Sequence, residues 1–290
     1  GHNRNASAQS SIYDRVQYNK IKTLCAYKKP VSLSNERKQM NSKKRLAIDG
    51  GEKTRTSPLP DGKKVGAEEL KELTDVIESG QMFRWGGTKV IQFEKEFAEL
   101  YGVKHAIASS SGTASIHVAL GMIDPAPGDE IITGPITDLG SILPIIYQNC
   151  IPIFADVQPD TYNLDPASVE ANITEKTKAI MAIHLFGNPT DMNPLVELAR
   201  KHNLVLIEDC SQAHLAEYCG KFVGTVGDIG CFSLQQSKHM TTGAGGVTIT
   251  NRDDYGVRGL LFTDKGQHQD WQWPRKYSLI GLNYHMTELQ

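Results

Sequence analysis

The chain has 290 residues, a formal net charge of -2, and 39% hydrophobic against 22% charged residues. That length and composition can bury a full core in one large or two modest domains. The near-neutral charge gives no reason to expect binding to nucleic acid or to a membrane, and no apolar run is long enough to cross a bilayer or to form a signal-peptide core.

The charge is unevenly distributed along the chain. Residues 1–45 contain 11 Lys and Arg against 2 Asp and Glu, which leaves 20 against 31 for the remainder. This basic segment is rich in Ser and Asn and shows neither helical nor strand periodicity, so we expect a disordered leader, with a transit-like segment as the alternative. We expect the folded body over 46–290.

Five cysteines, an odd number without C-x-x-C spacing, predict neither a zinc site nor a disulfide framework. A reducing cytoplasm is therefore the expected compartment. The five are Cys25, Cys150, Cys210, Cys219 and Cys231.

The body begins with two amphipathic helices, predicted over 66–79 and 90–101, with a Gly/aromatic loop between them. Short apolar strands then alternate with helices, which is typical of a mainly parallel α/β sheet. The predicted strands are 106–108, 130–133, 151–156, 179–184, 205–209, an apolar run ending at Phe232, and 247–250. The helices predicted between them include 114–122, one ending at Ile146, and 194–202.

Ligands gather at the carboxyl ends of the strands in open α/β sheets, so the residues after each strand are the candidates for a site. Residues 111–114 open a helix with small side chains, which suits an anion such as phosphate, although a plain helix N-cap is the alternative. Asp209 ends a strand and could pair with a protonated ring nitrogen, or it could be another N-cap. Ser233 follows a third strand, five positions before Lys238.

Lys238 lies between two predicted strands and ahead of a glycine cluster. A solvated surface lysine is the ordinary interpretation, and a Schiff-base lysine is the functional one. An anion cup, a strand-end carboxylate, a hydroxyl and a lysine, in this order along a parallel α/β chain, are the parts that pyridoxal phosphate requires. His184 and His214 also follow strands, and we expect both to be packed or hydrogen-bonded rather than catalytic.

Several segments of this pattern occur together and in a fixed order. They are Ser111-Gly112-Thr113-Ala114, Glu208-Asp209-Cys210-Ser211-Gln212-Ala213, Phe232-Ser233 with Lys238, Thr242-Gly243-Ala244-Gly245-Gly246 and Asn283-Tyr284-His285-Met286-Thr287-Glu288. Over 46–290 the chain resembles the DegT/DnrJ/StrS family of pyridoxal-phosphate-dependent sugar aminotransferases. The resemblance implies the fold-type-I large domain, an α/β fold with a mainly parallel seven-stranded sheet and helices on both faces.

The resemblance also implies a role for each matching residue. Lys238 would carry the cofactor as an internal aldimine and move the proton between cofactor and substrate carbons. Asp209 would hold the pyridine nitrogen, and Gln212 would hydrogen-bond the phenolic oxygen. The residues implied for the phosphate are Gly112, Thr113, Ala114 and Ser233. Asn283 would reach the phosphate site of a neighbouring subunit, which implies a homodimer with shared active sites.

The chain departs from the family pattern at four points. Leu139 stands where an aromatic residue usually stacks on the pyridine ring, so it would offer apolar cover without a π face. Ala244 replaces a glutamate of the glycine turn, and His285 replaces an arginine. A helix is expected to begin at Thr287, and because the chain stops at Gln290 we expect a truncation before the family's small C-terminal domain.

The resemblance implies transfer of an amino group from L-glutamate, or from glutamine, to a keto group on a nucleotide-linked sugar or cyclitol. A related sugar dehydratase is one alternative, but members with that activity have histidine in place of Lys238. The departures motivate a second alternative, a non-catalytic pyridoxal-phosphate-binding or regulatory protein on the same scaffold. Dinucleotide binding has little support because no G-x-G-x-x-G follows the first strand, and no metal is expected. Trp271 and Trp273 are predicted to lie in a surface loop.

Overall fold

The computed structural model of the chain describes residues 45–58, 65–268 and 276–290. The predicted leader, apart from Arg45, and the loop with Trp271 and Trp273 lie outside the described residues. The chain divides into two units at the Pro60–Asp61 bond. In the first unit the described residues include one short 3-10 helix, η2 (Ala47–Asp49), which has no buried residue. All strands of the main sheet belong to the second unit.

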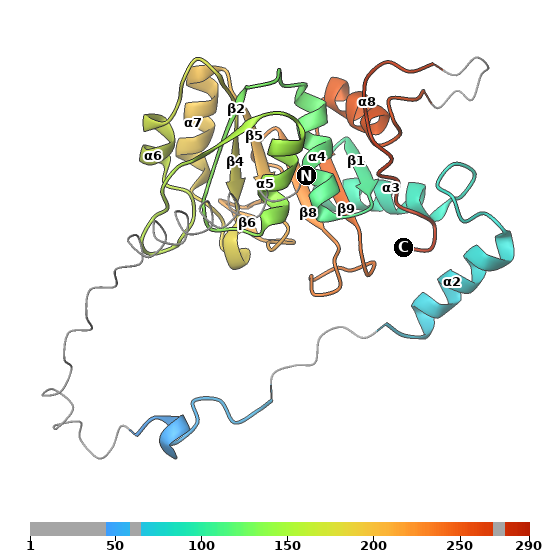
Figure 1. The fold of residues 1–290 in the computed structure, drawn as a ribbon. Coiled ribbons are helices and arrows are strands. Elements are labelled where there is room, and N and C mark those ends of the chain that lie inside the picture. Colours follow the sequence, from blue (N-terminus) through green and yellow to red (C-terminus); the bar gives the residue numbers. More distant parts are fainter. Residues whose placement is uncertain (1–44, 59–64, 269–275) are drawn as a thin grey trace, which may run out of the picture. The chain divides into compact units, whose positions relative to one another are not determined.

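The second unit is built on a seven-stranded sheet of order β1-β9-β8-β5-β4-β2-β3. Figure 1 shows β4, β5, β8 and β9 following one another across it. Its strands are β1 (His105–Ser109), β2 (Glu130–Thr133), β3 (Ile151–Phe154), β4 (Thr177–Ile183), β5 (Val205–Asp209), β8 (Ile229–Ser233) and β9 (Gly246–Thr250). Strands β3, β2, β4, β5 and β8 pair in parallel, and β9 runs antiparallel to both β8 and β1. The mainly parallel seven-stranded sheet predicted from the sequence is confirmed. A two-stranded hairpin, β6 (Glu217–Tyr218) with β7 (Lys221–Phe222), stands apart from it.

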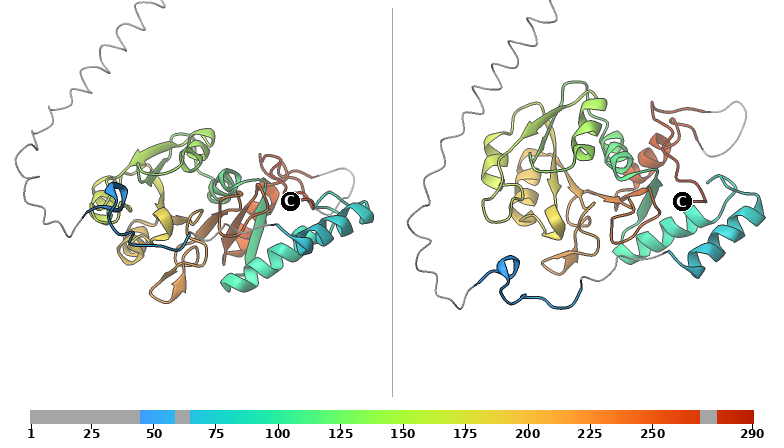
Figure 2. Two further views of the ribbon diagram at one scale, coloured as in Figure 1. Left: turned by 90° about the horizontal axis from the view of Figure 1, so that it is seen from below. Right: turned by 60° about the horizontal axis from the view of Figure 1, so that its bottom comes forward.

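Helices cover both faces of this sheet. They are α2 (Ala67–Ser79), α3 (Lys89–Tyr101), α4 (Gly112–Ile123), α5 (Leu139–Tyr147), α6 (Pro166–Ala171), α7 (Met192–His202) and α8 (Asp253–Phe262), with a short η3 (Leu185–Gly187) after β4. In the left view of Figure 2, α3 in teal and α5 in green lie on opposite sides of the strands. None of the helices in the described part of the chain is long and apolar enough to cross a membrane.

Strand β4 shows why the strands of the sheet have continuous apolar sequences. Successive side chains point to opposite faces, and both faces are covered. Ala179 and Met181 pack in the cluster that includes residues of α4, α5 and α8, whereas Ile180 and Ala182 pack in the cluster that includes residues of α6 and α7. All four side chains have 0% exposure. Both faces of β4 are therefore buried, which is why its sequence shows no alternation of polar and apolar residues.

Local capping sets where the helices begin. The Ser111 Oγ accepts a hydrogen bond from the Ala114 N–H at 3.0 Å, so Ser111 is an N-cap and α4 begins two residues before the predicted start. The Asp138 Oδ1 accepts from the Gly140 N–H at 2.7 Å and begins α5 in the same way. Both capped helices follow strands of the parallel sheet, and their N-termini therefore lie at its carboxyl edge.

The helix expected from Thr287 is wrong, because residues 288–289 form a turn. The Glu288 N–H donates to the Met82 carbonyl at 3.1 Å. The Glu288 carboxylate accepts backbone N–H groups at the start of α3 instead of supporting a helix of its own.

Candidate active site

A pocket of about 410 Å³ lies at the carboxyl edge of the parallel strands. Side chains that follow β2, end β4 and β5, and end β8 all line it, together with the first turn of α4. Six of the nine predicted site residues meet here, although they are spread over 127 positions of sequence, from 112 to 238. They are Gly112, Thr113, Asp209, Gln212, Ser233 and Lys238.

The first turn of α4 forms one end of this pocket. The N–H groups of Gly112 and Thr113 belong to the helix-start donors that a helix cannot satisfy internally, and the helix dipole adds partial positive charge there. A Cβ on Gly112 would lie 2.6 Å from the Ser233 Cβ, so a side chain cannot fit at that position. The glycine therefore lets a backbone donor and the Ser233 side chain approach the same ligand, which suits a phosphate group.

Asp209, the last residue of β5, contributes a negatively charged side chain to the pocket. The residue is only 4% exposed. Its Oδ1 accepts from the Ser211 N–H at 3.0 Å, and its Oδ2 accepts from the Ser141 hydroxyl at 2.7 Å. The Ser141 Oγ in turn lies 2.8 Å from the Thr137 Oγ1. Asp209 is followed by a turn and caps no helix. Its carboxylate is thus oriented on both oxygens, which suits a partner that carries a proton on a ring nitrogen.

Ser141 and Thr137 were not among the predicted site residues. Both line the pocket. The available signal was their position: hydroxyl side chains just after a strand and in the first turn of the next helix lie at the same sheet edge as Asp209.

The neighbour of Asp209 points to the other face and builds a buried network. Glu208 is 0% exposed and its Oε1 accepts from the N–H groups of Val226 and Gly227 at 2.9 and 2.6 Å. Its Oε2 lies 3.0 Å from the His184 Nε2, and the His184 Nδ1 accepts from the Thr190 N–H at 3.0 Å. His184, Glu208 and Cys210 offer possible metal-ligand atoms within 4.8 Å of one another. The His184 and Glu208 atoms, however, are already hydrogen-bonded. The network anchors the strand that presents Asp209.

The two histidines at strand ends are packed and hydrogen-bonded, as expected. His184 is held by Glu208, and the His214 Nε2 lies 2.8 Å from the Ser233 carbonyl oxygen. Burial lowers the pKa of His214 below its ordinary value. Neither imidazole lines the pocket.

Lys238 lies in the loop that joins β8 to β9. The Leu234 N–H donates to the Gly245 carbonyl at 2.8 Å and the Gln236 N–H donates to the Gly243 carbonyl at 3.0 Å, so the two sides of the loop are paired. The Lys238 side chain is partly buried and lines the same pocket as Asp209. This placement favours the functional interpretation of the lysine over the solvated one.

Three predicted residues do not line the pocket. Ala114 is 3% exposed inside α4, and its N–H is taken by Ser111. Leu139 is 62% exposed at the start of α5. Asn283 is exposed and forms an isolated bridge with Asp264, and its role toward a neighbouring subunit stays a prediction.

His285, which stands where the family usually has an arginine, also lies outside the pocket. The His285 side chain is buried between the edges of Phe83 and Trp85, with its Nε2 3.5 Å from the Asp264 Oδ2. Burial lowers the pKa of His285 below its ordinary value, and the Asp264 carboxylate opposes that shift.

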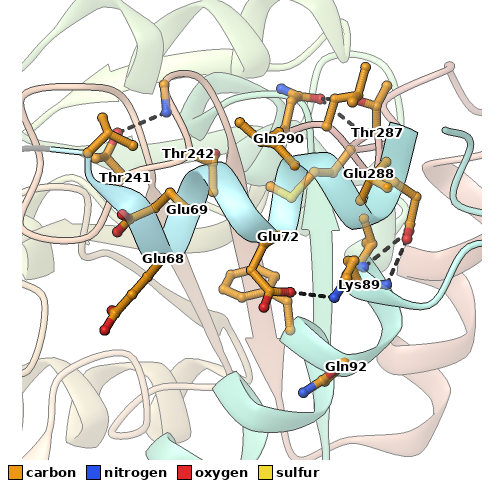
Figure 3. A pocket seen from close by; sticks show the side chains of 18 of the residues that line it. Glu68, Glu69, Glu72, Lys89, Gln92, Thr241, Thr242, Thr287, Glu288 and Gln290 are labelled. Carbon is orange, nitrogen blue, oxygen red and sulfur yellow. Dashed lines mark hydrogen bonds and ion pairs between the residues drawn. The ribbon is translucent and has the colours of Figure 1, made fainter. Parts of the chain in front are cut away.

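A larger groove of about 820 Å³ lies between α2, α3 and the segment 286–290 (Figure 3). Figure 3 shows Glu68, Glu69 and Glu72 on α2, with Glu72 paired to Lys89 of α3. Val76, Val90 and Phe93 supply apolar lining. None of the nine predicted site residues lines this groove, and the chemistry-bearing side chains converge in the smaller pocket.

The residues of the smaller pocket fit pyridoxal phosphate. Backbone donors at a helix start suit its phosphate dianion, a buried and doubly hydrogen-bonded carboxylate suits its ring N–H, and a lysine amine is available to its aldehyde. The glycine that a Cβ could not replace lies at the phosphate end.

Comparison with known proteins also points to an aminotransferase. A model of the DegT/DnrJ/EryC1/StrS aminotransferase family matches residues 63–290. A putative L-glutamine:3-amino-2,3-dideoxy-scyllo-inosose aminotransferase of Streptoalloteichus tenebrarius is 37% identical over 250 residues, covering 84% of this chain and 59% of that protein. The GDP-perosamine synthase of Caulobacter vibrioides is 43% identical over 204 residues, covering 70% and 54%.

A solved structure is similar as well. The aminotransferase from Psychrobacter cryohalolentis superposes with a TM-score of 0.74 at 38% identity, covering 80% of this chain and 61% of that one. The chain thus spans less than two thirds of the length of each of these three proteins.

Proposed function

Because the chain belongs to the DegT/DnrJ/EryC1/StrS aminotransferase family, whose enzymes use pyridoxal phosphate, we propose that it acts in amino transfer to a keto sugar or cyclitol. The amino group would come from an amino acid, L-glutamate or L-glutamine. One observation carries the proposal: Asp209, Lys238 and the start of α4 meet in one pocket at the carboxyl edge of the sheet.

Each end of the pocket has a distinct task. The N–H groups that open α4, with Ser233 beside them, would hold the phosphate of the cofactor. The carboxylate of Asp209, whose two oxygens are oriented by Ser141 and Ser211, would hold a protonated ring nitrogen. When bound, pyridoxal phosphate supplies an electron-accepting ring and an aldehyde that reacts with amines.

Lys238 is the group that can move a proton. Its Nζ would hold the aldehyde of pyridoxal phosphate, and as a free amine it would be the base that accepts and returns the proton during amino transfer. The alternative dehydratase activity lacks support, because this position is lysine rather than histidine.

The acceptor class follows from the names of the relatives. One relative is named for an inosose, which is a keto cyclitol, and another for a GDP-linked amino sugar. A cyclitol or nucleotide-linked sugar ketone is therefore the proposed acceptor. We further propose a cytoplasmic homodimer in which Asn283 serves the partner's phosphate site, since Asn283 is exposed.

The test is chemical trapping. The full chain is incubated with pyridoxal phosphate, reduced with borohydride and digested, and we expect a pyridoxyl group on the peptide containing Lys238. Lys238→Ala should lose the adduct, whereas Lys201→Ala, at a surface lysine paired with Glu170, should keep it. Wild-type chain without the adduct would refute the cofactor assignment.

A second measurement separates catalysis from mere binding. Adding L-glutamate or L-glutamine to the loaded chain should convert the cofactor to its amine form, with release of the matching 2-oxo acid. An adduct on Lys238 without this half-reaction would favour the non-catalytic alternative, which the exposed position of Leu139 supports.

A further inference from the structure

The turn after β4 holds an aromatic residue in an unfavourable backbone conformation. Phe186 has φ 53° and ψ 26°, in the left-handed region that residues other than glycine and asparagine rarely adopt. Its side chain is 84% exposed, so burial of the ring does not offset the cost. Such strain persists where the surroundings impose it, and it is enriched beside functional sites.

Buried contacts impose this turn from both ends. Asn163, which is 2% exposed, accepts from the Leu185 N–H through Oδ1 at 3.1 Å and donates through Nδ2 to the Asn188 carbonyl at 2.9 Å. The His184 N–H donates to the Asp209 carbonyl at 3.1 Å. The turn is thereby fixed to the end of the strand that presents Asp209.

The fixed turn directs one donor at the site. The Phe186 N–H donates to the Gln212 Oε1 at 2.7 Å. Gln212 lines the pocket together with Asp209 and Lys238. A carboxamide has one oxygen that accepts and one nitrogen that donates, so an N–H partner on one side decides which atom the other side presents.

We propose that Phe186, through its backbone N–H, orients the Gln212 carboxamide so that the Nε2 donor faces the ring oxygen of bound pyridoxal phosphate. That oxygen is anionic or shares its proton, and it needs a donor rather than a carbonyl oxygen. Phe186 is then a positioning residue, and Asn163 supports it from outside the pocket. This inference rests on the proposed function, because it assigns a group within the same site.

The test is a double-mutant cycle on the full chain, read by equilibrium binding of pyridoxal phosphate. Gln212→Ala should weaken binding about tenfold, the effect of one lost hydrogen bond. Asn163→Ala should weaken it about threefold, and the double variant should bind no worse than Gln212→Ala alone. Effects of the two substitutions that multiply would overturn the relay.

Two further variants separate the N–H from the ring. Phe186→Gly keeps the N–H and removes the backbone cost, so binding should stay within about twofold of wild type. Gln212→Glu offers two acceptors and no donor, so it should weaken binding at least as much as Gln212→Ala and should shift the pH midpoint of the visible absorbance band. Tight binding by Gln212→Glu would contradict the donor assignment.

A measurement without cofactor tests the contact itself. Amide hydrogen exchange at Phe186 should quicken in Gln212→Ala relative to wild type, and Asn163→Asp should give an intermediate rate because it keeps the oxygen facing Leu185. Unchanged exchange in both variants would refute the contact. Failure of wild-type chain to bind pyridoxal phosphate would instead refute the proposed function, so the two failures are distinguishable.

Discussion

Replacing Glu288 by glutamine tests how the segment at 286–290 is attached to the sheet domain. The Glu288 side chain reaches the start of α3, where its Oε2 accepts from the N–H groups of Thr88 and Lys89 at 2.8 and 2.7 Å. Its Oε1 accepts from the Val90 N–H at 3.1 Å. Figure 3 shows the carboxylate directed at this turn. Glu288 therefore caps α3 from 198 or more positions away in sequence.

The magnitude follows from what glutamine retains. Glutamine keeps one acceptor oxygen and places an NH₂ group against backbone N–H donors, whichever way the amide is turned. It also removes a negative charge from the positive end of a helix dipole, in a residue that is only 6% exposed. The lost cap and the lost charge together should lower the free energy of unfolding by about 2–3 kcal/mol.

The assay is urea unfolding followed by circular dichroism, with Glu99→Gln as the matched control. Glu99 lies in the last turn of the same helix, exposed and 3.8 Å from Lys95, and its substitution should change stability by less than about 0.5 kcal/mol. Hydrogen exchange at the Val90 amide should quicken only in Glu288→Gln. Equal stabilities for the two variants would refute the capping argument.

Two more substitutions probe buried polar groups. Arg84→Met should lower the free energy of unfolding by about 3–5 kcal/mol, because it leaves the buried Glu94 carboxylate without its cation. Urea unfolding measures this loss. Adding Glu94→Gln to Arg84→Met should recover a large part of it, and no recovery would contradict the prediction. Burial lowers the pKa of His117 below its ordinary value of 6.5, so the stability that neutral His117 contributes is present above about pH 6.5 and falls as the pH drops toward the folded-state pKa. His117→Gln should therefore lose less stability than wild type between pH 7 and pH 5, and parallel pH profiles would contradict this.

The strands and most helices could be predicted from sequence because each has a local cause. The central strands are apolar on both faces, and helices such as α2 end in a glycine with positive φ, at Gly80. The pocket was predictable through topology, since parallel strands bring their carboxyl ends to one edge. Residues as distant as Gly112 and Lys238 could thus be assigned to one site without knowing the coordinates.

Helix α8 was not predicted, and its sequence explains why. It contains Gly256 and Gly259, which lower intrinsic helix propensity. A Cβ on Gly256 would lie 2.6 Å from the His105 ring, and one on Gly259 would lie 2.3 Å from the Met122 side chain. The glycines are there for close packing against β1 and α4, and that requirement depends on tertiary contacts that local propensity does not contain.

The missed site groups share the same cause. The Ser141 hydroxyl that holds Asp209 comes from α5, 68 positions earlier in sequence, and Gln212 is oriented by a backbone N–H of Phe186. A backbone donor has no signature in the sequence. The prediction of a helix from Thr287 was wrong for a related reason. The Glu288 carboxylate accepts from N–H groups at the start of α3, a tertiary contact that the local sequence does not show.

The antiparallel strand β9 explains why the lysine lies over the site. A parallel connection leaves the carboxyl edge and returns at the other end of the sheet, whereas an antiparallel pair keeps both ends of its loop at one edge. Ser233 pairs with Gly246, so the loop that carries Lys238 starts and ends at the edge where Asp209 lies. A Cβ on Gly246 would lie 2.2 Å from the Ser111 carbonyl oxygen. The loop therefore returns against the start of α4, and Lys238 lines the same pocket as Gly112 and Asp209.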